Sequence, residues 1–320
     1  MTDRTDTRPG VDPAMLAFAE ALPTFTIADG VEAARDIIRK LTVPAEMLPA
    51  MRIEDRVVGF GEITDVPVRI YWPPGVDEKN LPVVVLYHGG GWAIGDLDTY
   101  DAVARTHVIG TDAIVVSVDY RLAPEHPWPA GIDDSWAALR WVGEHAAELG
   151  GDPDRVAVAG DSSGGNFAAV MAQLARDHAG PKLVYQLLWY PAATCDLTLP
   201  SHIENANTPI LGHDQVAAFM TWYLPGMTFT DSTALPPTVA PANADLSGLP
   251  PTFIGTAEYD PIRDDGARYA EMLTAAGVVV EHQHEPTLLH GYVSVAGLIP
   301  AATEATQTGL SALRRALHPA

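Results

Sequence analysis

Residues 156–175 read VAVAGDSSGGNFAAVMAQLA, and this stretch decides the fold. The apolar run VAVAG predicts a buried strand, the glycine-rich DSSGG predicts a tight turn, and the spacing of apolar residues after it predicts a helix. Gly160 to Gly164 match the pattern G-x-S-x-G. In that pattern the serine lies on a sharp strand-to-helix turn that exposes its hydroxyl above a sheet. Ser162 is therefore the candidate nucleophile, and a plain Gly/Ser turn is the alternative.

The strand–helix alternation extends over most of the chain. Residues 52–60 and 66–73 alternate between polar and apolar positions, as exposed antiparallel strands do. Continuous apolar runs, which are typical of parallel strands covered on both faces, occupy 83–88, 113–120, 183–190, 252–257 and 278–285. Helical spacing is found over 99–109, 130–149, 165–178, 262–276 and 291–316. The order predicts an α/β fold with a central, mostly parallel sheet in a three-layer sandwich.

Two regions depart from this alternation. Residues 1–12 are expected to form a disordered tail, and Pro13 to Lys40 have the spacing of two short amphipathic helices. That spacing does not distinguish a mobile cap from an ordinary packing pair. Residues 196–235 hold several prolines and one helical core, Gln215 to Leu224. An insertion there lies above the carboxyl ends of the strands, where open α/β sheets bind ligands.

The predicted division has four parts. Residues 1–50 supply the N-terminal cap helices and 196–235 the cap insertion, while 51–195 and 236–320 together form the catalytic α/β domain.

A triglycine loop follows the strand at 83–88. The sequence HGGGW starts at His88, and consecutive glycines let backbone N–H groups converge on one point without interference from side chains. A flexible loop or a phosphate cradle is the alternative, although the G-K-[ST] ending of a P-loop is missing. We predict oxyanion donors among the N–H groups of Gly89, Gly90, Gly91 and Ser163. His88 is predicted to brace the loop through hydrogen bonds.

The acid and the base of a triad should follow the serine in the order Asp or Glu, then His. Asp260 comes three residues after the apolar run at 252–257, and His290 lies in a loop after the last strand. Glu258, Asp264 and Asp265 are rivals for the acid. The two later aspartates stand where a helix begins, so capping or pairing with the helix dipole explains them better.

Composition limits the partners and the location. The chain has 320 residues, 41 acidic against 19 basic, and a formal net charge of -22. Such a charge repels nucleic acid and anionic membrane surfaces, so a small-molecule substrate is expected. The single cysteine, Cys195, allows neither an internal disulfide nor a cysteine-based metal site, and we expect no metal and no cofactor. With no apolar leader and no 18-residue apolar run, the prediction is a cytoplasmic protein without membrane insertion. Monomer and homodimer both stay open.

The motifs together resemble the bacterial hormone-sensitive-lipase-like esterases. The matching text is YHGGGWAIGDLDTYD (87–101), VDYRLAPEHPWPAGIDD (118–134), GDSSGGN (160–166), EYDPIRDDG (258–266) and HGY (290–292). The resemblance implies a capped α/β-hydrolase fold, short- to medium-chain acyl esters as substrates and no cofactor. It also implies a triad of Ser162, Asp260 and His290, with oxyanion donors from Gly90, Gly91 and Ser163. The family usually has alanine at the position of Ser163, but a backbone donor survives that change.

The predicted function is therefore that of a carboxylic-ester hydrolase, which works through a Ser-Asp-His triad and an acyl-enzyme intermediate. An amidase or peptidase on the same fold is one alternative. A non-catalytic receptor for a small ligand is another, because plant gibberellin receptors resemble this family. Such receptors lose the base histidine, whereas His290 is present here.

Overall fold

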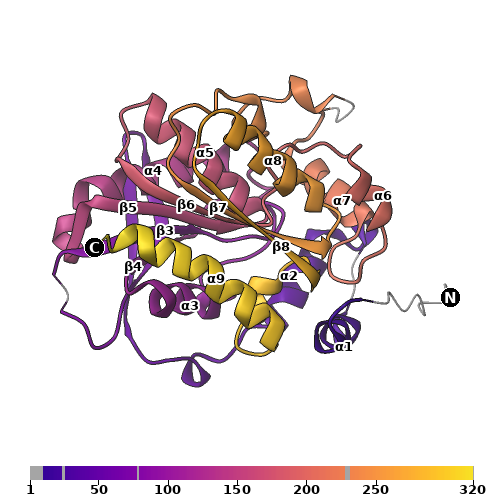
Figure 1. Ribbon diagram of the computed structural model, residues 1–320, viewed down its shortest axis with the longest axis horizontal. Helices are drawn as coiled ribbons and strands as arrows, with labels where there is room; N and C mark the ends of the chain where they lie inside the picture. Colours follow the sequence, from indigo (N-terminus) through magenta and orange to yellow (C-terminus); the bar gives the residue numbers. More distant parts are fainter. Residues whose placement is uncertain (1–9, 24–25, 78, 228–230, 320) are drawn as a thin grey trace.

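One sheet runs through the part of the chain that the computed structural model describes, residues 10–23, 26–77, 79–227 and 231–319 (Figure 1). Its strands are β1 (Arg52–Phe60), β2 (Ile63–Trp72), β3 (Leu81–Tyr87), β4 (Ile114–Val118), β5 (Gly151–Asp161), β6 (Leu183–Trp189), β7 (Thr252–Tyr259) and β8 (Val280–Leu289). They lie in the order β1-β2-β4-β3-β5-β6-β7-β8.

The sheet is mostly parallel. β1 pairs with β2 and β2 with β4 in antiparallel fashion, while every pair from β4 through β3 to β8 is parallel. The carboxyl ends of β3, β5, β7 and β8 therefore meet at one edge. In the β3–β5 pair, Tyr87 lies opposite Gly160, so the loops after these two strands start side by side. The predicted α/β fold with a mostly parallel sheet is confirmed.

Helices cover both faces of the sheet (Figure 1). The α-helices are α1 (Pro13–Ala21), α2 (Gly30–Lys40), α3 (Asp101–Thr111), α4 (Ala130–His145), α5 (Ser163–Asp177), α6 (Pro200–Glu204), α7 (His213–Tyr223), α8 (Arg263–Ala275) and α9 (Pro300–Leu317). Short 3₁₀ turns lie at Ile27–Asp29, Ala45–Met47, Ala146–Leu149, Ser232–Ala234, Pro241–Asn243 and Tyr292–Val295.

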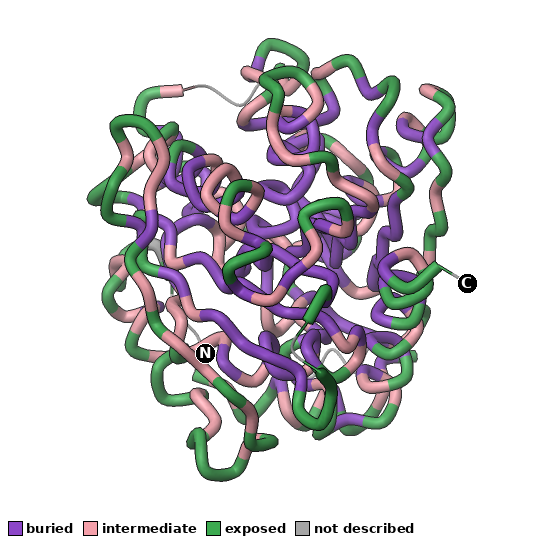
Figure 2. Tube along the Cα trace, turned by 90° about the vertical axis from the view of Figure 1, so that its left-hand side faces the viewer, coloured by how far each residue is buried: buried purple, intermediate pink, exposed green. Residues whose placement is uncertain are grey.

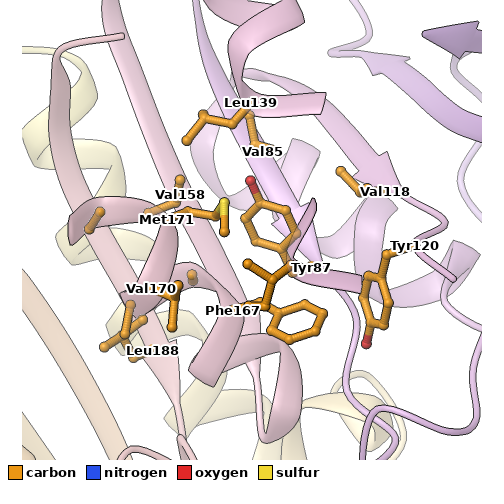
Figure 3. Close-up of a cluster of buried hydrophobic side chains, with 14 of the residues drawn as sticks. Val85, Tyr87, Val118, Tyr120, Leu139, Val158, Phe167, Val170, Met171 and Leu188 are labelled. Carbon is orange, nitrogen blue, oxygen red and sulfur yellow. The ribbon is translucent and has the colours of Figure 1, made fainter. Parts of the chain in front are cut away.

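Two hydrophobic clusters, one on each face, hold the layers together. α4, α5 and α8 pack on one face, where Tyr87, Phe167 and Met171 belong to a single cluster (Figure 3). α3 and α9 pack on the other face against side chains such as Val84 and Leu86. Successive residues of β3 thus point to opposite faces, and both are buried, as expected for a strand covered on two sides. Figure 2 shows this buried centre surrounded by exposed loops and helix surfaces.

The N-terminal prediction is partly wrong. Residues 1–9 of the expected tail lie outside the described residues, but Val11 is buried, and the N–H of Asp12 donates to the Thr287 carbonyl over 2.8 Å. The Asp12 carboxylate also accepts from the N–H groups of Ala14 and Met15, so it caps α1. An aspartate before a proline at the first helical position is a signal for the start of a helix. The backbone hydrogen bond of Asp12 to Thr287 joins this segment to the end of β8.

The C-terminal helix also begins later than predicted. Instead of one helix over 291–316, a 3₁₀ turn at Tyr292–Val295 is followed by α9 from Pro300. Gly297 has φ of 90°, which interrupts helical geometry, and Pro300 occupies the first turn of α9, where a missing N–H costs nothing.

The region between β6 and β7 contains α6, α7 and the loops around them. α7 matches the predicted helical core at Gln215 to Leu224, whereas α6 was not predicted. α2 is anchored nearby, because Arg35 donates to the Ala93 carbonyl over 2.9 Å and pairs with Glu125 at 2.7 Å. Across the described ranges, none of the helices is both long enough and apolar enough to span a bilayer.

Candidate active site

Ser162 lies at the turn between β5 and α5. Its backbone has φ of 55° and ψ of -118°, a strained conformation for a residue with a side chain. The turn is held because the Ser162 N–H donates to the Trp189 carbonyl (2.9 Å) and its carbonyl accepts from the Asn166 N–H (3.0 Å). The flanking glycines are needed for space, since a Cβ on Gly160 would lie 2.2 Å from the Gly164 carbonyl oxygen. Packing therefore imposes the strain that the motif suggested.

Three side chains from three strand ends meet at this turn. His290 Nε2 lies 3.0 Å from Ser162 Oγ, and His290 Nδ1 lies 2.7 Å from Asp260 Oδ2. Asp260 is fully buried and His290 is 8% exposed. The second oxygen of Asp260 accepts the Ile262 N–H over 2.9 Å, which fixes the carboxylate. The rival Glu258 pairs instead with an arginine and a histidine away from this chain of hydrogen bonds.

Asp264 and Asp265 lie in the first turn of α8, where acidic side chains suit the helix dipole. The capping interpretation is wrong, however, because their carboxylates bind backbone of the segment between β6 and β7. Asp264 accepts the Ser201 N–H over 2.9 Å, and Asp265 accepts the Thr194 N–H. Burial raises the pKa of Asp265 to about 7. Both aspartates fasten the β6–β7 segment to the body of the protein.

The triglycine loop follows β3 and faces the serine turn. Gly90 and Gly91 have φ of 116° and 58°, in the region that favours glycine. A Cβ on Gly90 would lie 2.2 Å from the Ile94 carbonyl oxygen, and one on Gly91 would lie 2.2 Å from the Phe219 ring. Both glycines border the same cavity as Ser163, the first residue of α5, whose N–H has no carbonyl within the helix to bind.

Gly89 does not join this set. Its N–H donates to Asp161 Oδ1 over 2.9 Å, so the prediction of Gly89 as an oxyanion donor is corrected. His88 lies fully buried beneath the loop, with Nδ1 2.8 Å from the Gly89 carbonyl oxygen. The Tyr120 hydroxyl donates to the His88 carbonyl over 2.6 Å, and the two rings stack. Burial lowers the pKa of His88 to about 4, so its ring is neutral at physiological pH.

A cavity of about 190 Å³ opens beside Ser162 Oγ. Its wall is mostly apolar, as is usual for sites that hold a small organic molecule. The residues that line it are Ile38, Gly90, Gly91, Trp92, Ile94, Tyr100, Asp161, Ser162, Ser163, Ala192, Ile210, Leu211, Val216, Phe219, Ile262, His290, Gly291 and Ser294. They come from the strand ends, from α2 and from the β6–β7 segment. In the described part of the chain, no three His, Cys, Asp or Glu side chains are grouped as a metal site.

Asp161, Tyr100 and Phe219 are among the cavity residues that were not singled out from the sequence. Asp161 stands inside the G-x-S-x-G motif, and its position next to the nucleophile was the available signal. Tyr100 belongs to the loop before α3, and Phe219 to the helical core of the β6–β7 segment. For these two, nothing in the local sequence separates a cavity wall from ordinary packing.

Comparison with known proteins gives the family of the chain. Residues 84–294 match the family model described as the alpha/beta hydrolase fold. The chain is 66% identical to carboxylesterase NlhH of Mycobacterium tuberculosis, over 99% of this chain and 100% of that protein. It is 51% identical to esterase LipI of the same organism, over 99% of each.

The structural comparison leads to the same family. The esterase of Pyrobaculum calidifontis superposes with a TM-score of 0.87 at 36% identity, and the match covers 95% of this chain and 98% of that one. Family model, sequence relatives and solved structure each cover most of the chain. The chain therefore belongs to the α/β-hydrolase family, among the carboxylesterases of the bacterial hormone-sensitive-lipase-like group.

Proposed function

We propose that this carboxylesterase hydrolyses short- to medium-chain acyl esters through Ser162, His290 and Asp260. The observation that carries the proposal is the continuous hydrogen-bond chain from Ser162 Oγ through the imidazole to Asp260, at 3.0 and 2.7 Å, beside an apolar cavity. A nucleophile, a base within hydrogen-bond reach and a buried group that orients the base are the parts that acyl transfer requires.

The first half of the reaction is acylation. His290 Nε2 accepts the proton of Ser162 as Oγ attacks the ester carbonyl carbon, and Asp260 stabilises the imidazolium that forms. The carbonyl oxygen becomes an oxyanion that accepts hydrogen bonds from the N–H groups of Gly90, Gly91 and Ser163. Collapse of this intermediate breaks the ester C–O bond, and the imidazolium gives its proton to the leaving alcohol.

Deacylation repeats the same steps with water as the nucleophile. His290 takes a proton from the water, the oxyanion donors stabilise the second tetrahedral intermediate, and Ser162 leaves with the proton that the imidazole returns. His88 takes no part in proton transfer in this scheme. We propose that it braces the loop, which its burial and its contact with the Gly89 carbonyl support.

Substrate size follows from the cavity wall. We propose that residues 1–50 and 196–235 act as the cap, because Ile38, Leu211 and Phe219 bring apolar side chains to the cavity. An apolar pocket this small suits acyl chains of about four to eight carbons. The cytoplasmic location and the choice between monomer and homodimer stay predictions from the sequence.

A series of p-nitrophenyl esters from acetate to palmitate tests the proposal. We expect kcat/KM to be highest for acyl chains of about four to eight carbons and to fall for palmitate. The p-nitroanilide of the preferred acid is the amidase control, and faster turnover of that anilide than of the ester would favour the amidase alternative. Binding of the esters without any turnover would favour a receptor and overturn the proposal.

A further inference from the structure

The oxyanion donors of this enzyme come from two separate segments. Gly90 and Gly91 follow β3, whereas Ser163 follows β5. Because one oxygen atom must accept from both segments, the distance between the two loops has to be fixed closely. A misplacement of about 1 Å can cost roughly 10²-fold in rate. The sheet pairs β3 with β5 only as far as Tyr87 and Gly160, so something beyond the strands has to hold the loops.

One side chain bridges these loops. Asp161, the residue before the nucleophile, accepts the Gly89 N–H at Oδ1 over 2.9 Å. Its other oxygen, Oδ2, accepts the Tyr100 hydroxyl over 3.1 Å. Asp161 is 4% exposed, so its contact with the Gly89 N–H is shielded from water and is stronger than a surface hydrogen bond, while its contact with the Tyr100 hydroxyl is partly buried.

The loop backbone at Gly89 packs so closely against Asp161 and Tyr100 that a side chain at this position has no room. A Cβ at this position would lie 2.5 Å from Asp161 Oδ2 and 2.7 Å from the Tyr100 hydroxyl oxygen. The φ of Gly89 is not in the positive range, so space rather than backbone conformation is what a side chain would violate here. The backbone of the triglycine loop is therefore pressed directly against the carboxylate.

We propose that Asp161 is a positioning residue, which sets the spacing of the two halves of the oxyanion hole by holding the Gly89 N–H, with the Tyr100 hydroxyl fixing the orientation of the carboxylate. The proposal rests on the mechanism proposed above, since it needs Gly90, Gly91 and Ser163 as donors. It makes the aspartate of the serine motif act on transition-state binding through the Gly89 backbone rather than through a hydrogen bond to the oxyanion.

Charge offers a competing role for the same side chain. Burial raises the pKa of Asp161 to about 6, while its hydrogen bond from Tyr100 and the nearby His290 favour the ionised form. The carboxylate is thus ionised at pH 8 and could act on the imidazolium instead of on the loop. Asparagine separates the two roles, because its side-chain oxygen still accepts the Gly89 N–H although the charge is gone.

The test compares Asp161→Asn with Asp161→Leu, which has a similar size but accepts no hydrogen bond. Both are assayed at pH 8 with p-nitrophenyl butyrate, together with the inhibition constant of an aliphatic trifluoromethyl ketone, whose adduct with the serine carries an oxyanion. For Asp161→Leu we expect kcat to fall by about 10²-fold, KM to change less than about threefold, and the ketone to bind about 10²-fold more weakly. Asp161→Asn should keep at least about a third of the wild-type kcat.

Two further variants keep the test decisive if Asp161→Leu does not fold. Gly89→Ala pushes a methyl group into the carboxylate and should reduce kcat and ketone affinity in parallel. Tyr100→Phe should lower kcat by less than about tenfold. Its matched control is Tyr71→Phe, which removes the hydrogen bond of 2.8 Å from another buried tyrosine to Asp101 on α3. Neither of these two residues lines the cavity, so the control should leave kcat unchanged.

The outcomes are distinct. Equal losses in Asp161→Asn and Asp161→Leu would overturn the proposal in favour of a charge effect on His290. Lower melting temperatures with unchanged kcat and ketone affinity would overturn it in favour of a purely structural role. If the wild type fails to hydrolyse the ester, or Ser162→Ala retains its activity, then the proposed function is wrong, and this failure is distinct from a failure of the proposal for Asp161.

Discussion

Two regions of this molecule form one cavity in different ways. The strand-end loops comprise residues 88–92, 160–164, 260–262 and 290–291. The covering segments comprise α2 and the β6–β7 segment. In the loops, backbone hydrogen bonds and positive φ values place each group, as at Ser162 and Gly91. The covering segments contribute mainly apolar side chains such as Ile38 and Phe219. We therefore expect the chemistry to depend on backbone geometry and the substrate selectivity to depend on side-chain volume.

Ser162→Ala tests most directly whether the strand-end loops carry the chemistry. If the loops carry the chemistry, kcat falls by roughly 10⁴-fold or more, as for other triad nucleophiles. The fold should survive, because alanine and serine suffer the same strain at φ of 55°. Turnover of p-nitrophenyl butyrate and the melting temperature are the measurements. Retention of more than about a tenth of the wild-type kcat would remove Ser162 as the nucleophile.

Ser163→Ala is the matched control for that variant. It deletes a hydroxyl one residue away but leaves the backbone N–H that the mechanism uses, so most of the activity should remain. Mass spectrometry after treatment with an organophosphate adds an independent check. The wild type and Ser163→Ala should gain one phosphonyl group at Ser162, and Ser162→Ala should gain none.

Asp260→Asn gives the second largest expected effect. The side chain keeps its shape but loses the charge that orients and stabilises the imidazole 2.7 Å away, so kcat should fall by about 10³–10⁴-fold. Asp264→Asn is the control, because that carboxylate holds the Ser201 N–H and an arginine rather than His290. A greater loss in Asp264→Asn than in Asp260→Asn would mean that Asp260 is not the acid of the triad.

The sharp turn at Ser162 between a strand and a helix was predicted from the sequence. Strain and close backbone approach restrict a position to one residue type. Ser162, the glycines beside it and the order Ser, Asp, His can therefore be recognised from the sequence alone. The sheet was also predicted from the sequence, because strands such as β3 that are buried on both faces consist of continuous apolar residues.

The remaining features depend on contacts between residues distant in sequence. Gly89 looked equivalent to its two neighbours until its N–H was found on Asp161. Asp265 looked like a helix cap until its carboxylate was found on the backbone of residue 194, which is 71 positions away. Local patterns report local geometry, and they do not report which partner a polar group meets across the fold.

The stability of the covering segments should depend on pH. His202 on α6 is 1% exposed, and burial, followed by the neighbouring His213, lowers its pKa from 6.5 to about 4. Between pH 6.5 and pH 4 the His202 imidazole is therefore protonated in the unfolded chain but neutral in the folded chain. The contribution of His202 to the free energy of unfolding is complete above pH 6.5 and is lost as the pH falls towards 4. Between pH 7 and pH 5 this histidine should cost about 2 kcal/mol of unfolding free energy.

Denaturant unfolding of the wild type and His202→Gln at pH 7 and pH 5 measures this term. The variant should lose about 2 kcal/mol less than the wild type between the two values. Ile203→Gln, which introduces the same side chain at the exposed neighbouring position, should keep the wild-type pH dependence. Parallel curves for all three proteins would show that α6 stays packed when His202 is protonated.

Phe219 gives the smallest expected effect and the closest view of how the two regions meet. Its ring packs on Gly91, since a Cβ there would lie 2.2 Å from a ring carbon, and it also lines the cavity. Phe219→Ala should lengthen the cavity along α7 and raise kcat/KM for decanoate relative to butyrate by about tenfold. Met220→Ala is the control, because the next side chain packs into the core and should reduce stability without altering the ratio. An unchanged ratio in Phe219→Ala would mean that the acyl chain does not lie along α7. The covering segments would then face the alcohol side of the ester, and selectivity for leaving groups would be the property that they set.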